Sequence, residues 1–181
     1  MGYEKLTISE MGRMSVEAYR LADKLPIDVV LDNVRSRHNI GAVLRTSDAF
    51  RINRVHLCGI CSVPPNAEIH KTALGAEDSV QWQYHADTLS AVNELHDKGF
   101  KVYAIEQAHG STPLSDMRLK KNAAIAVVFG HEVYGVAQEV VDACDGCIEI
   151  PQYGTKHSLN VSVTAGIVLY ELSEQLRKSD S

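Results

Sequence analysis

Three polar, glycine-containing stretches hold the side chains that could do chemistry. They read NVRSRHNIGAVLRT (33–46), VVFGHEVYG (127–135) and IEIPQYGTKHSLN (148–160), and the last two open on apolar residues typical of a strand end. The third is dense in hydrogen-bonding groups, since residues 153–158 are Tyr, Gly, Thr, Lys, His and Ser. These six residues cannot build a core, yet they stand directly before an apolar helical pattern. We therefore expect this loop to hold a ligand.

The glycine patterns indicate which ligands the loops do not suit. No G-x-G-x-x-G is present, and residues 130–135 resemble the start of a phosphate loop only until Val136 and Ala137, where Lys and Ser/Thr are required. Glu132 inside that turn would also repel a phosphate. No G-x-S-x-G hydrolase elbow is present either. The sequence therefore predicts a pocket walled by backbone turns, for a cofactor that is not anchored through phosphates.

Five polar side chains are expected to project near that pocket, and two of them have simpler explanations. The five are Glu132, Ser158, Asn160, Asn39 and Arg45. Ser158 is also well placed to cap the last helix, a role that could explain it alone. Arg45 has small or polar neighbours one turn away on its helix, so its guanidinium stands clear of bulk; it could equally be an ordinary surface arginine.

The four cysteines form two C-x-x-C pairs, Cys58/Cys61 and Cys144/Cys147, which raise the question of zinc or thiol chemistry. The pairs are separated by far more chain than the ~15 to 20 residues of a zinc ribbon. Cys58 ends the apolar run VHLC and fits a small buried strand residue. The sequence predicts no metal site, and a zinc- or thiol-dependent protein would require all four cysteines to converge.

Composition indicates one globular domain outside the membrane. The chain has 181 residues, 45% of them hydrophobic and 23% charged, and no apolar run approaches the ~20 residues of a membrane helix. The N-terminus lacks an apolar signal core, so we expect a cytoplasmic protein.

The net charge of −5 argues against a general nucleic-acid coat, but the charges are unevenly distributed. Five arginines and one acid lie between Arg35 and Arg54, whereas residues 132–149 carry five acids and no Lys or Arg. The arginine cluster could attract a polyanion locally, or it could be a solvated helix face.

Apolar runs and helical patterns alternate along the chain. Strands are expected at Ile27–Leu31, Val55–Ile60, Val80–Tyr84, Val102–Ile105, Ala123–Phe129 and Cys147–Ile150. Helices are expected at Ile40–Arg51, Thr88–Lys98 with Thr88 as its cap, Val136–Ala143, Asn160–Arg177 and, near the N-terminus, Ser9–Lys24. This alternation predicts an α/β fold with a mostly parallel sheet flanked by helices, and such sheets bind ligands beyond the carboxyl ends of their strands.

In order and spacing, the three polar stretches resemble the three motifs of the SpoU (TrmH-like) RNA 2′-O-methyltransferases of the SPOUT superfamily. The resemblance runs from about Ile27 to Glu171, and we expect a methyltransferase domain at 27–178 behind an N-terminal helical extension at 1–26. It implies a C-terminal trefoil knot (the SPOUT fold), S-adenosyl-L-methionine (AdoMet) as cofactor, and a homodimer with its active sites near the subunit interface. Small residues at Ser162, Ala165 and Gly166, with Val161, Val168 and Leu172, could form that interface or pack on the chain's own sheet.

The resemblance also implies roles for individual residues. The functional positions of the family fall on Asn39, Arg45, Glu132, Ser158 and Asn160. The loop Gln152–Leu159 would fold over the cofactor, and its neighbours would be Glu106, Phe129, Gly130 and Ile150. His131 stands where relatives often carry Asn or Ser. The chemistry implied is methyl transfer to a ribose 2′-hydroxyl of tRNA, preferred over rRNA because no room remains for a separate RNA-binding domain; the alternative is a knotted dimer that binds RNA without methylating it.

Overall fold

A computed structural model describes residues 2–178, and its centre is a seven-stranded parallel sheet. The order is β3-β2-β1-β6-β4-β7-β5. The strands are β1 (Leu25–Asp32), β2 (Ile52–Cys58), β3 (Trp82–His85), β4 (Lys101–Ile105), β5 (Thr112–Pro113), β6 (Ile125–Phe129) and β7 (Gly146–Glu149). The predicted α/β class and parallel sheet are confirmed.

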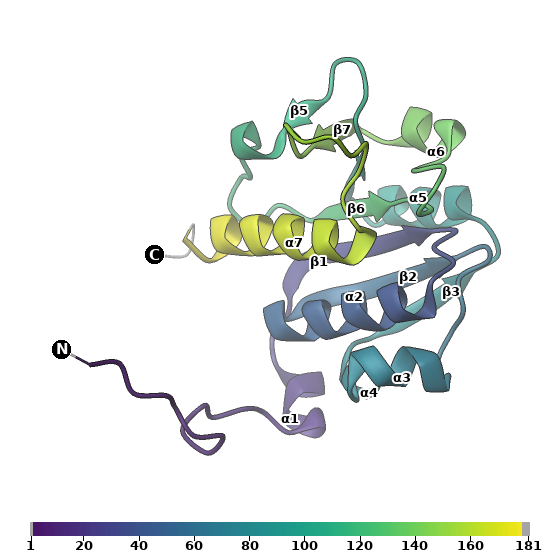
Figure 1. Cartoon of the computed structure of the whole chain (residues 1–181). Coiled ribbons are helices and arrows are strands. Elements are labelled where there is room, and N and C mark those ends of the chain that lie inside the picture. Colours follow the sequence, from purple (N-terminus) through teal and green to yellow (C-terminus); the bar gives the residue numbers. More distant parts are fainter. Residues whose placement is uncertain (1, 179–181) are drawn as a thin grey trace.

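Helices cover both faces of the sheet (Figure 1). Their bounds are α1 (Val16–Leu21), α2 (Arg37–Phe50), α3 (Ala67–Ala73), α4 (Ala76–Ser79), α5 (Thr88–Asp97), the 3₁₀ turn η1 (Leu114–Asp116), α6 (Gln138–Ala143) and α7 (Val161–Lys178). Helices α2 and α7 lie side by side over one face, with α3 beyond α2, and α5 and α6 lie behind the other. None of these helices, within residues 2–178, has the length and apolar character needed to cross a membrane.

Strand β6 illustrates why the apolar runs are continuous rather than alternating. Ile125, Val127 and Phe129 pack with the α2 and α7 side of the core, whereas Ala126 and Val128 pack with the α5 and α6 side. Each large side chain fully buried in this way contributes about 1.5–3 kcal/mol. A strand covered on both faces has no polar side, so the run reads as apolar throughout.

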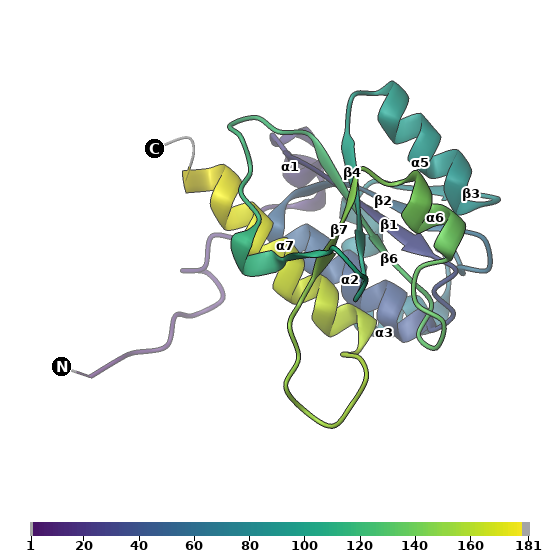
Figure 2. The same ribbon diagram turned by 90° about the horizontal axis from the view of Figure 1, so that it is seen from above.

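The strand order brings distant segments together at one end of the sheet. β6 lies between β1 and β4, and it pairs with both in parallel. The carboxyl ends of β1, β6, β4 and β7, at Asp32, Phe129, Ile105 and Glu149, therefore lie along one edge. The long connection from β7 to α7 projects beyond this edge (Figure 2). The trefoil knot implied by the resemblance stays a prediction.

Several expected elements differ in the structure. The N-terminal helix spans only Val16–Leu21 rather than Ser9–Lys24, because residues 8–12 form a turn that ends at Gly12 with φ +56° and Ser15 caps α1. Asp87, not Thr88, caps α5, with its side chain accepting from Ser90 N. The sequence analysis also missed α3, α4, β5 and η1, which are too short to show a clear period.

Some apolar residues of α7 are buried in the core, and others are exposed on the surface. Val161, Val168 and Leu172, which are candidates for a subunit interface on sequence grounds, are buried in the core of the chain itself, as is Ala165. A different set remains exposed on the same helix, namely Val163, Ile167 and Tyr170, and we call it the α7 stripe. These residues are spaced four and three apart, so they follow one face of the helix.

Helix α2 approaches α3 so closely that Gly41 has no space for a side chain. A Cβ there would lie 2.2 Å from Thr72 Oγ1 and 2.3 Å from Ile69 O. We expect Gly41→Ala to lower the free energy of unfolding by about 1–3 kcal/mol, as overpacking does. Urea unfolding followed by circular dichroism measures this.

Adding Thr72→Ala to Gly41→Ala should recover only part of the loss, because the carbonyl of Ile69 stays in place. A Gly41→Ala protein as stable as the wild type, as at an unhindered helix position, would contradict this packing.

Candidate active site

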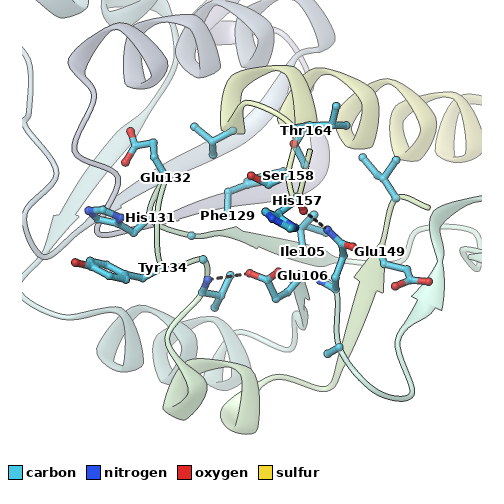
Figure 3. Close-up of a pocket in the computed structure, with 18 of the residues that line it drawn as sticks. Ile105, Glu106, Phe129, His131, Glu132, Tyr134, Glu149, His157, Ser158 and Thr164 are labelled. Atoms are coloured by element: carbon cyan, nitrogen blue, oxygen red, sulfur yellow. Dashed lines mark hydrogen bonds between the residues drawn. The ribbon is translucent and has the colours of Figure 1, made fainter. Parts of the chain in front are cut away.

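A pocket of about 970 Å³ lies at the carboxyl ends of β4, β6 and β7, and the β7–α7 connection closes one side of it (Figure 3). That volume is at the upper end of the range for small-molecule sites. All seven residues expected at the cofactor line this pocket: Glu106, Phe129, Gly130, Ile150, Gln152, Ser158 and Leu159. Their location agrees with the expectation, and their role in binding stays a prediction.

The carboxylate of Glu132 joins the second polar stretch to the first. It accepts hydrogen bonds from Ser36 N at 2.8 Å, Arg35 N at 3.1 Å and Asn39 Nδ2 at 3.1 Å. Partial burial alone would raise the pKa of Glu132, but the bonds from the Ser36 and Arg35 backbone and from Asn39 lower it below its usual value. Glu132 is therefore an anion whose oxygens are already occupied, and it acts as an anchor for the start of α2.

Asn39 extends this connection to the third stretch. Its Oδ1 accepts from Asn160 Nδ2 at 3.2 Å, and Asn160 Oδ1 in turn accepts from Ser162 N at 2.9 Å. Asn160 thus caps α7, so the alternative explanation of Ser158 as the cap of this helix does not hold: Ser158 lies two residues earlier and lines the pocket, as expected. The structure therefore brings Glu132, Asn39 and Asn160 into one hydrogen-bonded chain.

A second carboxylate, Glu106, holds the floor of the pocket. Its Oε2 accepts from Val136 N at 3.2 Å and its Oε1 from Gln107 N at 2.9 Å. The turn it supports is tight, since a Cβ on Gly130 would lie 2.0 Å from the carbonyl carbon of Gly135. Gln107 Nε2 donates to His157 O at 2.8 Å and so ties the β7–α7 connection to the end of β4 (Figure 3).

The pocket is electrostatically negative. Its lining includes the carboxylates of Glu106, Glu132 and Glu149, and no Lys or Arg is present among the described residues that line it. Such a lining favours a cation and disfavours a phosphate. The observation agrees with the sequence-based expectation of a cofactor without a phosphate anchor.

Arg45 is not part of the pocket. It is exposed on α2, two turns beyond Asn39, and does not line the cavity. The expectation that it projects near the pocket is therefore not met within a single chain. Arg35, just before α2, donates its backbone N–H to Glu132, whereas Arg37, the first residue of α2, donates from Nε to Ser62 Oγ at 3.1 Å.

Sequence reasoning missed several residues of the pocket, among them Gln107, Glu149, His157 and Tyr134. A usable signal existed for the first two, because Gln107 follows the end of β4 and Glu149 ends β7, and strand ends of a parallel sheet meet at one edge. His157 lies in a loop that was identified as a whole. No signal marked Tyr134 apart from its position in the second polar stretch.

The four cysteines are free thiols, and no group of three or more His, Cys, Asp or Glu side chains within residues 2–178 is arranged to hold a metal ion. Cys58 at the end of β2 and Cys61 in the loop that follows are buried, and burial raises their pKa values to about 12 and about 11. Burial also raises the pKa of Cys144 to about 12 and that of Cys147 above its usual value. Raised values keep the thiols protonated, which makes them poor nucleophiles and ligands.

The fold is that of RNA methyltransferases with known structures. The A. aeolicus TrmH/SpoU tRNA modifying enzyme superposes with a TM-score of 0.80 at 27% identity, over 91% of this chain and 84% of that one. The AdoMet-bound rRNA methyltransferase from Sinorhizobium meliloti gives 0.77 at 26% identity, over 91% of this chain and 62% of that one.

The chain belongs to the SpoU rRNA methylase family, whose sequence profile matches residues 26–170. It is 32% identical over 171 residues to a tRNA (guanosine(18)-2′-O)-methyltransferase of Thermus thermophilus, in an alignment that covers 94% of this chain and 86% of that enzyme. The family expected from the three polar stretches is confirmed, and with it the expectation of a methyltransferase.

Glu132→Gln tests the anchor role of Glu132. The amide replaces one acceptor oxygen by a donor, so one of the N–H groups of Arg35 or Ser36 loses its partner. We expect a loss of about 1 kcal/mol in unfolding free energy, a modest value because the site opens to solvent.

The difference between wild type and variant should depend on pH. The lowered pKa of Glu132 means that its ionised form stabilises the fold above the unfolded-state value of about 4.3, and this contribution is lost as pH falls through the folded value. Urea unfolding at pH 7 and at pH 3.5 measures it. A difference that stays constant between the two would contradict the anchor role.

Proposed function

We propose that this chain transfers the methyl group of AdoMet to a ribose 2′-hydroxyl of tRNA. The observation that carries the proposal is the acidic pocket at the carboxyl ends of β4, β6 and β7, lined by two of the polar stretches and tied to the third through Glu132. Family membership supports methyl transfer, and the Thermus relative, aligned over most of its length, is named for ribose methylation of tRNA. We infer a cytoplasmic location from this proposed substrate.

The lining fits AdoMet. The cofactor carries a positive sulfonium, a positive α-amino group and no phosphate, and the carboxylates of Glu106 and Glu149 suit these charges. Backbone groups of Gly130 and Ile150 and the loop from Gln152 to Leu159 are available for its adenine and ribose. When bound, AdoMet supplies an electrophilic methyl group.

The chain's own residues would orient the substrate hydroxyl and assist the loss of its proton. Ser158 lines the pocket, and we place its hydroxyl beside the reacting ribose. Orientation of this kind can contribute about 7–11 kcal/mol to lowering the barrier. A guanidinium stays protonated at physiological pH, so Arg45 cannot accept the proton; we assign it to the RNA phosphate and to the alkoxide that forms as the proton leaves.

The position of Arg45 supports a site completed by a second copy of the chain. Arg45 is exposed on α2 and does not line the pocket of its own chain; α2 packs against α7, and the α7 stripe is apolar and exposed. Covering this stripe would remove three large apolar side chains from water. We propose a homodimer packed through the stripe, in which Arg45 serves the site of the other subunit.

The arginine cluster at the start of α2 supports RNA as the substrate. Arg35 and Arg37 are exposed, and the backbone N–H of Arg35 binds Glu132, so this part of the cluster adjoins a residue that lines the pocket. Removing either side chain should weaken RNA binding and flatten its salt dependence. Ribosomal RNA as the substrate, and an RNA-binding dimer without catalysis, are the alternatives that the experiments below separate.

Cofactor binding can be tested without RNA. AdoMet and S-adenosylhomocysteine should bind the purified protein without RNA, because the pocket lies within the folded chain, whereas ATP should bind far more weakly because its phosphates meet the carboxylates. Isothermal titration calorimetry measures all three. No heat from AdoMet at millimolar concentration, or tighter binding of ATP, would overturn the enzyme assignment.

The proposed role of Arg45 predicts a specific loss of rate. Arg45→Ala should lower the rate of methyl transfer by about 10² to 10³, as for a lost stabilising donor, and should leave AdoMet affinity unchanged. Single-turnover transfer from labelled AdoMet to hypomodified tRNA, with rRNA as the comparison substrate, measures the rate.

Mixing two inactive variants then tests the exchange of Arg45 between subunits. In randomly mixed dimers of Arg45→Ala and Ser158→Ala, about one site in four would hold both intact residues, so about a quarter of wild-type activity should return. The two variants tested separately serve as controls. No recovery from a mixture shown to contain heterodimers would place Arg45 and Ser158 in the same subunit.

A further inference from the structure

Tyr134 is an aromatic side chain that the chain leaves in water at the mouth of the pocket. Its side chain is 84% exposed, although it lines the cavity, and its neighbour Val133 is 72% exposed. An exposed tyrosine on a mobile surface loop needs no explanation. Here, however, the turn that carries the ring is closed by backbone hydrogen bonds, and the ring contacts His131.

The turn from His131 to Gly135 is closed by paired backbone bonds. His131 N donates to Gly135 O at 3.0 Å, and Gly135 N donates to His131 O at 2.8 Å. Gly135 has φ +69°, and a Cβ at this position would lie 2.1 Å from Glu106 Oε2. The turn is therefore packed against Glu106 at the pocket, and the backbone of the turn sets the Cα–Cβ direction of Tyr134.

His131 supports the tyrosine ring from one side. The two ring centroids are 4.9 Å apart and the planes are tilted by 31°, which is the range of an offset stack. The imidazole is itself held, because its Nδ1 accepts a hydrogen bond from Val133 N at 3.0 Å. Figure 3 shows the two rings side by side, at the end of the pocket where Glu132 lies and away from Glu149.

This end of the pocket is also where the RNA would arrive. Glu132 binds the backbone of Arg35 and Ser36, so the turn that carries His131 and Tyr134 adjoins the segment that begins the arginine cluster and leads into α2. If a ribose enters the pocket, as the proposed function requires, its base must lie within a few ångströms of the ribose. The chain offers an exposed aromatic face at this rim, and nucleobases stack on such faces.

We propose that the pair His131 and Tyr134 is the binding subsite for the base of the methylated nucleotide, with Tyr134 as the stacking surface and His131 as its support. The inference rests on the proposed function and adds the group that holds the nucleotide in register with the cofactor. Tyr134 is a positioning residue, since it touches the base rather than the reacting hydroxyl. There are two alternatives: that the ring binds the adenine of the cofactor, and that it packs against a second subunit.

The test compares Tyr134→Ala with Tyr134→Phe in the full-length protein. Loss of one stacked base costs about 1–3 kcal/mol, so kcat/KM for hypomodified tRNA should fall by about 5- to 150-fold in Tyr134→Ala and stay near wild type in Tyr134→Phe. AdoMet affinity by calorimetry and the mass by light scattering should not change. Tyr3→Ala, which removes another exposed tyrosine far along the chain from the pocket, is the matched control.

A second readout separates stacking from charge. Stacking involves no phosphate, so the slope of log Kd for tRNA against log salt should be the same in Tyr134→Ala as in the wild type, whereas Arg37→Ala should flatten it. Wild-type kcat/KM in Tyr134→Ala overturns the inference. So does weaker AdoMet binding, which would assign the ring to the cofactor, or a change in mass, which would assign it to a subunit contact. A wild-type protein that methylates no RNA ribose would instead refute the proposed function itself.

Discussion

The candidate site depends on the carboxylate of Glu132. Three donors from the start of α2 converge on it, and through Asn39 the same network reaches Asn160 and the first turn of α7. These groups come from three segments that lie far apart along the chain, and no apolar contact could fix their mutual orientation so narrowly. Because the bonds hold Glu132 ionised, the residue that fixes the geometry also contributes to the negative charge of the pocket.

Two regions of opposite charge meet at Glu132. The cavity presents carboxylates, whereas Arg35 and Arg37, just before and at the start of α2, are exposed to solvent. A polyanion is thereby kept at the rim while a cationic cofactor is favoured inside. This separation of charge explains how a protein with a net charge of −5 can still attract RNA. The attraction depends on the local concentration of arginines and not on the net charge of the chain.

The sequence predicted those parts of the fold whose burial leaves a clear pattern of apolar and polar residues along the chain. The continuous run Ala123–Phe129 favours a strand covered on both faces, which the structure confirms as β6, and the polar stretches that follow such runs marked the edge where the pocket lies. Short helices such as Ala67–Ala73 have too few turns for a period. The position of Arg45 and the cap of α7 could not be predicted for another reason, whereas Ser158 lines the pocket as expected. Residue type and spacing fix a position on an element, whereas pocket lining and capping depend on the angle at which α2 and the β7–α7 connection are packed.

The insertion of β6 between β1 and β4 has a consequence for the order in which the chain can assemble. β1 and β4 are made before β6 during synthesis, and neither can close its final ladder until residues 125–129 have entered the space between them. Such contacts join residues far apart in sequence, and topologies rich in them fold slowly. The anchor forms only after this step, because Glu132 follows β6 directly. Most of the groups that line the pocket also lie within residues 129–164, so a nascent chain that ends before β6 lacks most of the site.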